Sequence, residues 1–384
     1  MEIYFDNSAT TRVSERVLAI MEKTMREDYG NPSSKHLMGV RAEKYVRDAA
    51  QKIAKPMKVS EKEILFTSGG TESDNLALIG TALAGRRRGR HLITTAVEHP
   101  AVYEPLTFLE EMGFEITVLP VDADGHLNLA ELEEAIRPDT IAVSTMYVNN
   151  EVGAVEPVGE IASVIHRKNP ETYYHVDAIQ AYGKYRIYPK RLGIDLLSVS
   201  GHKLHGPKGV GFLYIDRRVK IRPILFGGGQ QGGLRSGTIN VPGIAGLGEA
   251  AEEVYESFEE KTARMISVKN RILEGVQEIP DVTVNSRPDL LSAPHIASIS
   301  VKGVRAEVLL HALEERGIYV SSGSACSSHH PGISGTLKGI GLGEELLDAT
   351  IRVSLCEDNT LVEAEEFLRV LRELVSALRR FTRR

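Results

Sequence analysis

From about residue 63 onward, short runs rich in apolar and β-branched residues alternate with amphipathic stretches. The strand-like runs span residues 64–67, 92–97, 115–119, 141–148, 173–177, 196–200 and 210–215. Helical spacing of apolar residues falls between most of these runs, as at 74–84, 102–112 and 129–136. Strands that alternate with helices predict an α/β fold with a largely parallel sheet covered on both faces. Ligands bind such sheets beyond the carboxyl ends of the strands, so the candidate site residues are those that follow each run.

The C-terminal part of the chain has a different pattern. A glycine-rich segment, FGGGQQGGLRSGTINVPG, precedes a long helical pattern at 250–279. Farther on, HIASISVKG and TIRVSLC have the composition of strands, while AEVLLHALEERG and LVEAEEFLRVLRELVSALRR have the apolar spacing of helices. We therefore expect the chain to pass here from a large domain to a smaller C-terminal one.

Composition and charge narrow the class of protein. Hydrophobic residues make up 42% of the chain and charged residues 26%, which is typical of a globular protein with a sizeable core. The net charge of -6 argues against a role in binding nucleic acid or a membrane surface, and no apolar run is long enough to span a bilayer. The start of the chain, MEIYFDNSATT, is unlike a secretory signal peptide.

The chain has two cysteines, Cys326 and Cys356, which cannot form a disulfide framework. This cysteine usage predicts a reducing, cytoplasmic location, where a cysteine that matters acts as a thiol. The histidines show none of the spacings that are typical of metal sites, so no metal is expected.

Polar residues that could take part in binding or catalysis follow several of the predicted strands. SGGTESDN follows the first strand and leads into a helix, whose N-terminus suits a phosphate near Gly70 and Thr71. Thr71 is equally compatible with an ordinary N-cap. His99 follows the second strand, where it would be useful if a flat aromatic cofactor needed a stacking partner. Asn150 follows a later strand and can donate a hydrogen bond to a phenolic oxygen, although asparagine there often only starts a turn.

Two further strand ends carry groups that suit the same ligand. Asp177 ends a hydrophobic strand, where a buried carboxylate needs a partner such as a protonated pyridine nitrogen, and Gln180 is close to it. Ser200, His202 and Lys203 end the next strand, in SVSGHKLHGPKGVGF. An amine desolvated there could form a Schiff base, whereas the later Lys208 is better interpreted as a turn residue. Together these groups describe a pyridoxal-phosphate pocket.

The sequence resembles the cysteine desulfurases of the class V aminotransferase family over nearly its whole length. The motifs that carry the resemblance are YFDNSATT, GNPSSKH, FTSGGTESDNLA, EHPAV, VNNEVGAV, HVDAIQ, SGHKLHGPKGVG, RSGTINVPGIAG, SSGSACSS and IRVSL. It implies fold-type I architecture, with a mostly parallel seven-stranded sheet in a large domain at 16–255. A smaller α+β domain would combine residues 1–15 and 256–384. It also implies pyridoxal 5'-phosphate and a homodimer.

The resemblance assigns a role to each candidate residue. Lys203 resembles the Schiff-base lysine, His99 the residue stacked on the ring and Asp177 the partner of the ring nitrogen. The other cofactor assignments are Asn150 and Gln180 at the phenolic oxygen, Thr71, Ser200 and His202 at the phosphate, and Thr238 at the phosphate of the neighbouring subunit. The resemblance assigns substrate binding to Arg352, at the α-carboxylate, to Asn150, and to Asn7 in the N-terminal segment that lines the site.

Cys326 matches the nucleophilic cysteine of the family, and its Ser/Gly-rich surroundings predict an exposed loop. Cys356 lies in an apolar run and is expected to be a small core residue. His329 and His330 follow Cys326, and a solvated loop is the favoured interpretation over a metal site.

The implied reaction removes sulfur from L-cysteine, leaving alanine and a persulfide on Cys326 for transfer to an acceptor. Iron–sulfur scaffold proteins are the usual acceptors of the family, and transfer-RNA thiolation or cofactor pathways are alternatives. Another class V activity, such as an aminotransferase or a selenocysteine lyase, and a non-catalytic sulfur-relay or scaffold-binding protein remain as rival interpretations.

Overall fold

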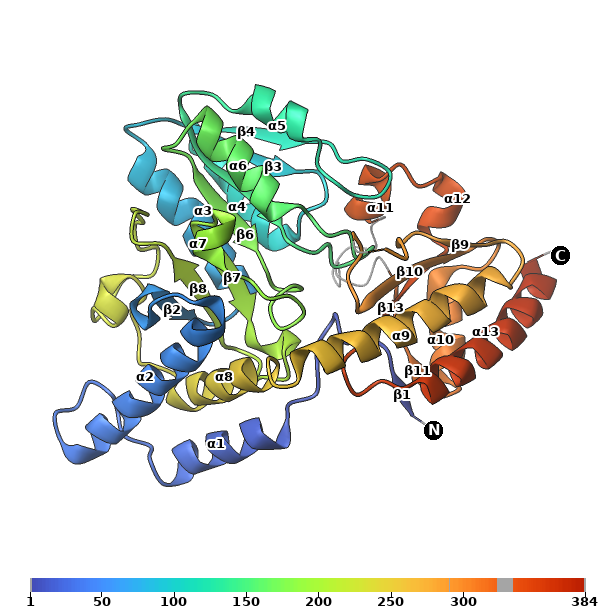
Figure 1. Cartoon of the computed structure of the whole chain (residues 1–384), viewed down its shortest axis with the longest axis horizontal. Helices are drawn as coiled ribbons and strands as arrows, with labels where there is room; N and C mark the ends of the chain where they lie inside the picture. Colours follow the sequence, from blue (N-terminus) through green and yellow to red (C-terminus); the bar gives the residue numbers. More distant parts are fainter. Residues whose placement is uncertain (1, 290, 323–333, 383–384) are drawn as a thin grey trace.

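A seven-stranded sheet forms the centre of the larger part of the molecule (Figure 1). The computed structural model describes residues 2–289, 291–322 and 334–382. The strands of this sheet lie in the order β2 (Ile64–Thr67), β8 (Gly211–Ile215), β7 (Leu196–Ser200), β6 (Tyr173–Asp177), β5 (Thr140–Met146), β3 (His91–Thr95) and β4 (Glu115–Leu119). Neighbouring strands are parallel except where β8 pairs with β2 and β7. The predicted α/β fold with a mostly parallel sheet is confirmed.

Helices cover both faces of this sheet. One face packs against α3 (Gly70–Gly85) and α4 (Pro100–Glu111). The other face packs against α2 (Leu37–Met57), α5 (Leu129–Ala135), α6 (Val158–Lys168) and α8 (Val241–Glu253). Side chains alternate across the sheet, so that Ile64 and Phe66 enter one core and Leu65 enters the other. Shorter elements complete this part: α1 (Glu15–Arg26), α7 (Pro189–Leu192), and the 3-10 turns η1 (Glu61–Glu63), η2 (Gly201–Lys203) and η3 (Gln231–Gly233).

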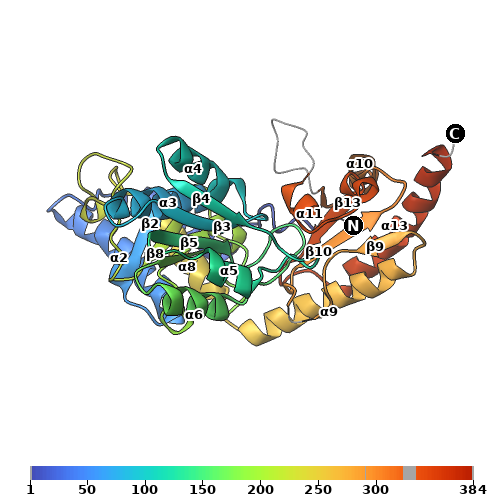
Figure 2. The same ribbon diagram turned by 90° about the horizontal axis from the view of Figure 1, so that it is seen from above.

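A smaller antiparallel sheet lies at the other end of the molecule (Figure 2). Its strands lie in the order β12 (Ser321–Ser322), β13 (Thr350–Ser354), β10 (Ile296–Val301) and β9 (Val282–Val284). The helices of this part are α9 (Phe258–Gln277), α10 (Ala306–Glu314), α11 (Gly335–Gly339), α12 (Glu344–Leu347) and α13 (Leu361–Thr382). The N-terminus joins it, because β1 (Ile3–Tyr4) pairs with β11 (Ile318–Tyr319). The division into domains at 1–15, 16–255 and 256–384 stays a prediction, and it agrees with the separate core that these elements form.

The single long helix predicted at 250–279 is wrong. The structure has two helices, and the chain turns at residues 254–257, where Ser257 has a φ of 48°. The turn lets the adjacent Val254 and Tyr255 both pack into the larger core, where the ring of Tyr255 meets the edge of Tyr182. α9 then buries a different face, including Val268, in the smaller core. Apolar spacing continues across the break, so the sequence pattern does not reveal it.

Two long helices before residue 63, α1 and α2, are not among the predicted elements. Both pack against α8, and α2 buries a stripe of small residues that includes Ala49 and Ala54. Within the described part of the chain, no helix is long and apolar enough to cross a membrane.

Candidate active site

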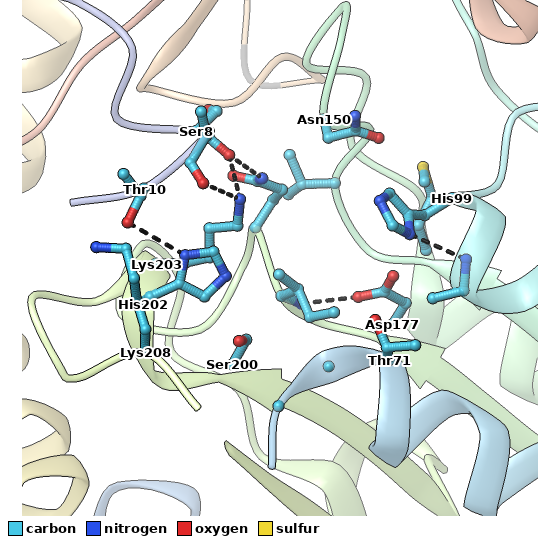
Figure 3. Close-up of a pocket in the computed structure, with 18 of the residues that line it drawn as sticks. Ser8, Thr10, Thr71, His99, Asn150, Asp177, Ser200, His202, Lys203 and Lys208 are labelled. Atoms are coloured by element: carbon cyan, nitrogen blue, oxygen red, sulfur yellow. Dashed lines mark hydrogen bonds between the residues drawn. The ribbon is translucent and has the colours of Figure 1, made fainter. Parts of the chain in front are cut away.

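A cavity of about 770 Å³ opens where the parallel strands of the large sheet end (Figure 3). This volume is typical of a pocket for a small molecule, and the position is the one that the strand-end rule predicts. The predicted residues that line it are Gly70, Thr71, His99, Asn150, Asp177, Gln180, Ser200, His202, Lys203 and Arg352. They come from segments that are far apart in the sequence, so the fold brings most of the predicted site together.

Two of the predicted residues that the structure describes, Asn7 and Thr238, do not line this cavity. The amide of Asn7 donates to the carbonyl oxygens of Tyr4 and Ser354 and to the side chain of Asn359, so Asn7 fixes the N-terminal segment. Thr238 is exposed in the glycine-rich segment. Cys326 lies outside the described residues, as do His329 and His330. The assignment of Asn7 to the substrate site stays a prediction.

Lys203 lies at the end of η2, directly after β7. Its Nζ donates to the carbonyl oxygens of Ser8 and Ala9, at 2.6 and 2.7 Å. Neutral carbonyl groups orient the ammonium without neutralising its charge. Lys208 also lines the cavity, but it is exposed and lies in the turn before β8, so the turn prediction holds for its backbone.

Asp177 is buried at the end of β6, and its Oδ1 accepts a hydrogen bond from the backbone N–H of Ile179 at 2.9 Å. Burial raises the pKa of Asp177 to about 8, and the neighbouring Asp74 adds to this shift, while Lys203 opposes it. Among the described residues, His175 and Lys203 only partly offset the cost of charging this carboxyl group. A protonated ring nitrogen would supply a cationic partner.

The loop between β2 and α3 provides a tight backbone cradle. Gly69 has a φ of 150°, and a Cβ at Gly211 would lie 2.8 Å from the Cα of Gly69, so both positions require glycine. Gly69, Gly70 and Thr71, at the start of α3, line the cavity, and the N–H groups at a helix N-terminus suit an anion. Gly69 is the N-cap of α3, so the alternative in which Thr71 caps the helix is excluded.

Two histidines flank the cavity as neutral groups. Burial, followed by the charges of Lys203 and Lys208, lowers the pKa of His202 to about 4. Burial, followed by the charge of Lys203, also lowers the pKa of His99. Nδ1 of His99 accepts a hydrogen bond from the backbone N–H of Ala101 at 3.0 Å and caps α4, so the proton of the neutral ring is on Nε2.

Gln180 and Arg352 connect the cavity to the small sheet. Gln180 donates through Nε2 to the carbonyl oxygen of Ser8 at 3.0 Å. Arg352, on β13, donates through Nη1 to the carbonyl oxygen of Asn150 at 2.8 Å and pairs through Nη2 with Asp6 at 3.0 Å. Its Nε is buried without a hydrogen-bond partner among the described residues, so this guanidinium has donor capacity left for a ligand.

Several residues of the site were not predicted from the sequence. Ser8 and Ala9 contribute backbone oxygens, and backbone groups leave no residue-type signal. Thr10 lies within hydrogen-bond distance of His202, at 3.2 Å. Asp74 lies on α3, in a motif that the sequence analysis selected for its glycines and threonine. The position of Asp74 on the buried face of the helix is the signal that could have identified it.

Comparisons with known proteins agree with this architecture. A model of the family described as aminotransferase class-V matches residues 3–367. A protein named cysteine desulfurase IscS, from Methanosarcina thermophila, is 43% identical over 377 residues, which cover 98% of this chain and 93% of the relative. A solved NifS-like protein has a TM-score of 0.93 at 40% identity, with 98% of this chain and 100% of that chain covered. A second structure, SspA in complex with cysteine, has a TM-score of 0.81 at 33% identity and covers 93% and 99% of the two chains.

The family uses pyridoxal 5'-phosphate, and the residues present fit this cofactor. The cavity combines three kinds of group: the amine of Lys203, the buried carboxyl group of Asp177, which no cation among the described residues fully offsets, and a glycine cradle at a helix N-terminus. These groups match the aldehyde, the ring nitrogen and the phosphate of the cofactor. With a family model that matches almost its entire length and this donor set in its cavity, the chain belongs to the aminotransferase class-V family.

Proposed function

We propose that this enzyme is a cysteine desulfurase, which converts L-cysteine to L-alanine and leaves a persulfide on Cys326. The observation that carries the proposal is the placement of Lys203, Asp177, His99 and Arg352 around one cavity. These side chains combine a mobile proton carrier, an electrostatic partner for a cofactor ring and an anchor for an α-carboxylate. The name of the Methanosarcina thermophila relative and the cysteine bound by SspA support L-cysteine as the substrate.

The N-terminus of α3 would hold the cofactor phosphate. Thr71 and the backbone N–H of Gly70 would contact it from the helix, and Ser200 and His202 from the end of β7. Because His202 is neutral, it would act there as a hydrogen-bond donor, and not as a counter-charge.

Asp177 would pair with the ring nitrogen of the cofactor, and the imidazole of His99 would stack on the ring. Asn150 and Gln180 would contact the phenolic oxygen. Gln180 is restrained for this role by its hydrogen bond to Ser8, which limits the rotamers of the amide.

Arg352 would bind the α-carboxylate of L-cysteine. A guanidinium group matches a carboxylate through two parallel hydrogen bonds, which fix orientation as well as affinity. Asp6 and the carbonyl oxygen of Asn150 hold the guanidinium in place before the substrate arrives. Pre-organisation of this kind reduces the entropy lost on binding.

Lys203 would carry the proton of the reaction. When bound, the cofactor supplies an electron sink for the charge that develops at the substrate Cα. The carbonyl oxygens of Ser8 and Ala9 hold Nζ of Lys203 inside the cavity, where it could accept the α-proton and return a proton to the product. His99, with its proton on Nε2, would be a second proton carrier beside the ring.

The Cys326 thiolate would attack the sulfur of L-cysteine. The Cβ–Sγ bond of the substrate breaks, a sulfur–sulfur bond forms on Cys326, and a proton adds at Cβ, so that L-cysteine and a thiol give L-alanine and a persulfide. Cys326 itself is outside the described residues, but both described ends of its segment lie beside the site. Ser321 of β12 pairs with Arg352, and Ser334 donates to Glu151, the neighbour of Asn150.

The proposal includes a homodimer in which Thr238 reaches the cofactor phosphate of the neighbouring subunit. The exposure of Thr238 and of Phe226 in the same glycine-rich segment supports a subunit contact there. An iron–sulfur scaffold protein or another sulfur acceptor would receive the persulfide sulfur, in the cytoplasm. The division into a large domain at 16–255 and a small one at 1–15 and 256–384 would place Arg352 and Cys326 on the small domain.

The proposed chemistry is tested by loading the protein with pyridoxal phosphate and measuring alanine formed from L-cysteine. Borohydride reduction before digestion would attach the cofactor to the lysine that holds it. We expect alanine formation in the wild type, the label on Lys203, and a loss of activity of at least about 100-fold in Lys203→Ala. A label on Lys208, or alanine formation that survives in Lys203→Ala, would contradict the assignment.

A further inference from the structure

Asp74 is an unusual group in the interior of the molecule. It lies on α3, and its side chain is fully buried between the helix and the sheet. Neither of its carboxylate oxygens makes a hydrogen bond of ordinary geometry with a described residue, although the hydroxyl group of Ser198 is close enough to lower the pKa of Asp74 against the larger effect of burial. Burying a carboxylate without hydrogen bonds is costly, so a position of this kind needs a compensating charge or a proton.

The nearest cationic candidate is His175 on β6. Nε2 of His175 lies 3.4 Å from Oδ1 of Asp74, and both side chains are fully buried. The ring is held between two hydroxyl groups, with Nδ1 at 2.8 Å from Oγ of Ser144 and Nε2 at 2.9 Å from Oγ of Ser198. Burial lowers the pKa of His175 to about 4, which favours the neutral ring, and burial raises the pKa of Asp74 to about 7.

This pair lies directly behind the cavity. His175 and Asp177 are two residues apart on β6, so their side chains are on the same face of the sheet, the face that α3 covers. Asp177 lines the cavity, whereas Asp74 and His175 do not. The other charged groups coupled to Asp177 are Lys203, across the cavity, and Glu98, near the end of β3.

We propose that Asp74 is a positioning residue for Asp177. Asp74 and His175 together hold one buried proton. When that proton leaves, the negative charge of Asp74 strengthens the interaction of Asp177 with a protonated cofactor ring nitrogen. The negative charge of Asp74 raises the pKa of Asp177, and it is the second largest cause of that shift, after burial. The inference rests on the proposed function in one respect, that Asp177 pairs with the ring nitrogen.

The consequence is a pyridine nitrogen that keeps its proton at higher pH. A ring nitrogen that faces one buried carboxylate, with a second behind it, loses its proton less readily than one that faces a single carboxylate. Asn at position 74 has nearly the shape of a protonated Asp but cannot become negative. Asp74→Asn should therefore lower the pH at which the ring nitrogen loses its proton, by about one pH unit.

The test uses the holoenzyme reconstituted with ¹⁵N-labelled pyridoxal phosphate, because the nitrogen chemical shift reports ring protonation independently of turnover. We expect a lower deprotonation midpoint in Asp74→Asn than in the wild type. The matched control is Glu156→Gln, which removes another buried carboxyl group whose pKa burial raises to about 8, but which is outside the cavity lining. Its midpoint should equal that of the wild type. An unchanged midpoint in Asp74→Asn with full cofactor loading would overturn the proposal.

A second measurement does not depend on the folding of Asp74→Asn. In the wild-type apoprotein labelled with ¹³C at the aspartate carboxyl groups, we expect two resonances that titrate near neutral pH, one of which Asp177→Asn removes. If every aspartate other than Asp177 titrates in the ordinary acidic range, Asp74 holds no proton and the proposal fails. Failure of the proposed desulfurase function would appear separately, as absence of alanine formation by the wild-type enzyme.

Discussion

Oε2 of Glu357 lies 3.2 Å from Nε2 of His205, two residues beyond Lys203. Glu357 follows β13, and its carboxylate also lies 3.6 Å from Nζ of Lys184 and 3.4 Å from Nζ of Lys261. His205 has a φ of 61°, in the left-handed region that non-glycine residues rarely adopt. Contacts that hold a strained residue beside a reactive one are typical of functional sites. This ion cluster joins the turn that follows Lys203 to the segment that follows β13, the strand of Arg352.

Replacing Glu357 with Gln should destabilise the fold by roughly 3 kcal/mol near neutral pH, because the buried cations lose their counter-charge. Burial opposes the ionisation of Glu357, but the charges of Lys184 and His205 outweigh it and hold the pKa of Glu357 below its ordinary value. The stabilisation from Glu357 is therefore present above the ordinary carboxyl pKa. It is lost as the pH falls through the pKa of Glu357 in the folded protein. Urea denaturation should show the gap between variant and wild type narrowing in acid.

The control for this variant is Glu365→Gln, which breaks an exposed ion pair with Arg271. It should leave the unfolding midpoint unchanged, since exposed pairs contribute little. Equal stabilities of Glu357→Gln and Glu365→Gln would show that the cluster at His205 does not hold the Lys203 turn.

Replacing Arg352 with Lys should raise the KM for L-cysteine by about 10- to 100-fold, because a charged hydrogen-bonded pair with the α-carboxylate is lost. Lysine keeps the charge but cannot form two parallel hydrogen bonds. Steady-state kinetics of alanine formation measure the change. Arg369→Lys, in an exposed group of ion pairs on α13, should behave as the wild type. An unchanged KM in Arg352→Lys would remove Arg352 from substrate binding.

The apoprotein should become less stable as the pH rises toward 8, in a way that depends on Asp177. Burial and the neighbouring Asp74 raise the pKa of Asp177 to about 8, so the folded state binds this proton more tightly than the unfolded chain does. The stabilisation that Asp177 contributes is fully present below the ordinary aspartate pKa. It is lost as the pH rises through the pKa of Asp177 in the folded protein. The stability difference between wild type and Asp177→Asn should therefore change by at most about 3 kcal/mol between pH 6 and pH 8.

Chemical denaturation at the two pH values measures this difference. Saturating pyridoxal phosphate should reduce it, since a cationic ring nitrogen offsets the charge on the carboxylate. A difference that is independent of pH would mean that Asp177 does not hold a proton at pH 6 in the apoprotein. A difference that the cofactor leaves unchanged would mean that Asp177 does not face the ring nitrogen.

Replacing Phe226 with Asp should break the proposed dimer and weaken cofactor binding together. Phe226 is 74% exposed and belongs to the same glycine-rich segment as Thr238. Val362, on α13, is 69% exposed and provides a control of similar exposure on the small part of the molecule. Analytical ultracentrifugation should show a monomer for Phe226→Asp and a dimer for Val362→Asp. A Phe226→Asp variant that stays dimeric and holds its cofactor normally would contradict this subunit contact.

The part of the site that follows the strands of the large sheet could be predicted from residue types. Asp177 and Lys203 each end a short apolar run, and a parallel sheet brings such ends together. Arg352 has no such signal. It lies within an antiparallel strand of the other sheet, so only the resemblance to a known family identified it.

Three parts of the structure could not be predicted, for different physical reasons. Ser8 and Ala9 act through their carbonyl oxygens, which every residue has, so the sequence pointed to their neighbour Asn7 instead. The break between α8 and α9 depends on two adjacent side chains that enter the same core, and apolar spacing alone does not distinguish this turn from a continuous helix. Asp74 and His175 depend on contacts between a helix and a sheet, which appear only once the layers are packed.

The most direct test of the proposed function is the mass of the peptide that contains Cys326 after turnover with L-cysteine. The proposal predicts one added sulfur atom on that peptide and none on the peptide of Cys356, which is buried and whose thiol pKa burial raises to about 11. Cys326→Ser should lose persulfide formation while retaining its cofactor, and Cys356→Ser should retain both. Alanine formation at the wild-type rate by Cys326→Ser, or an added sulfur on Cys356 instead, would contradict the proposed function.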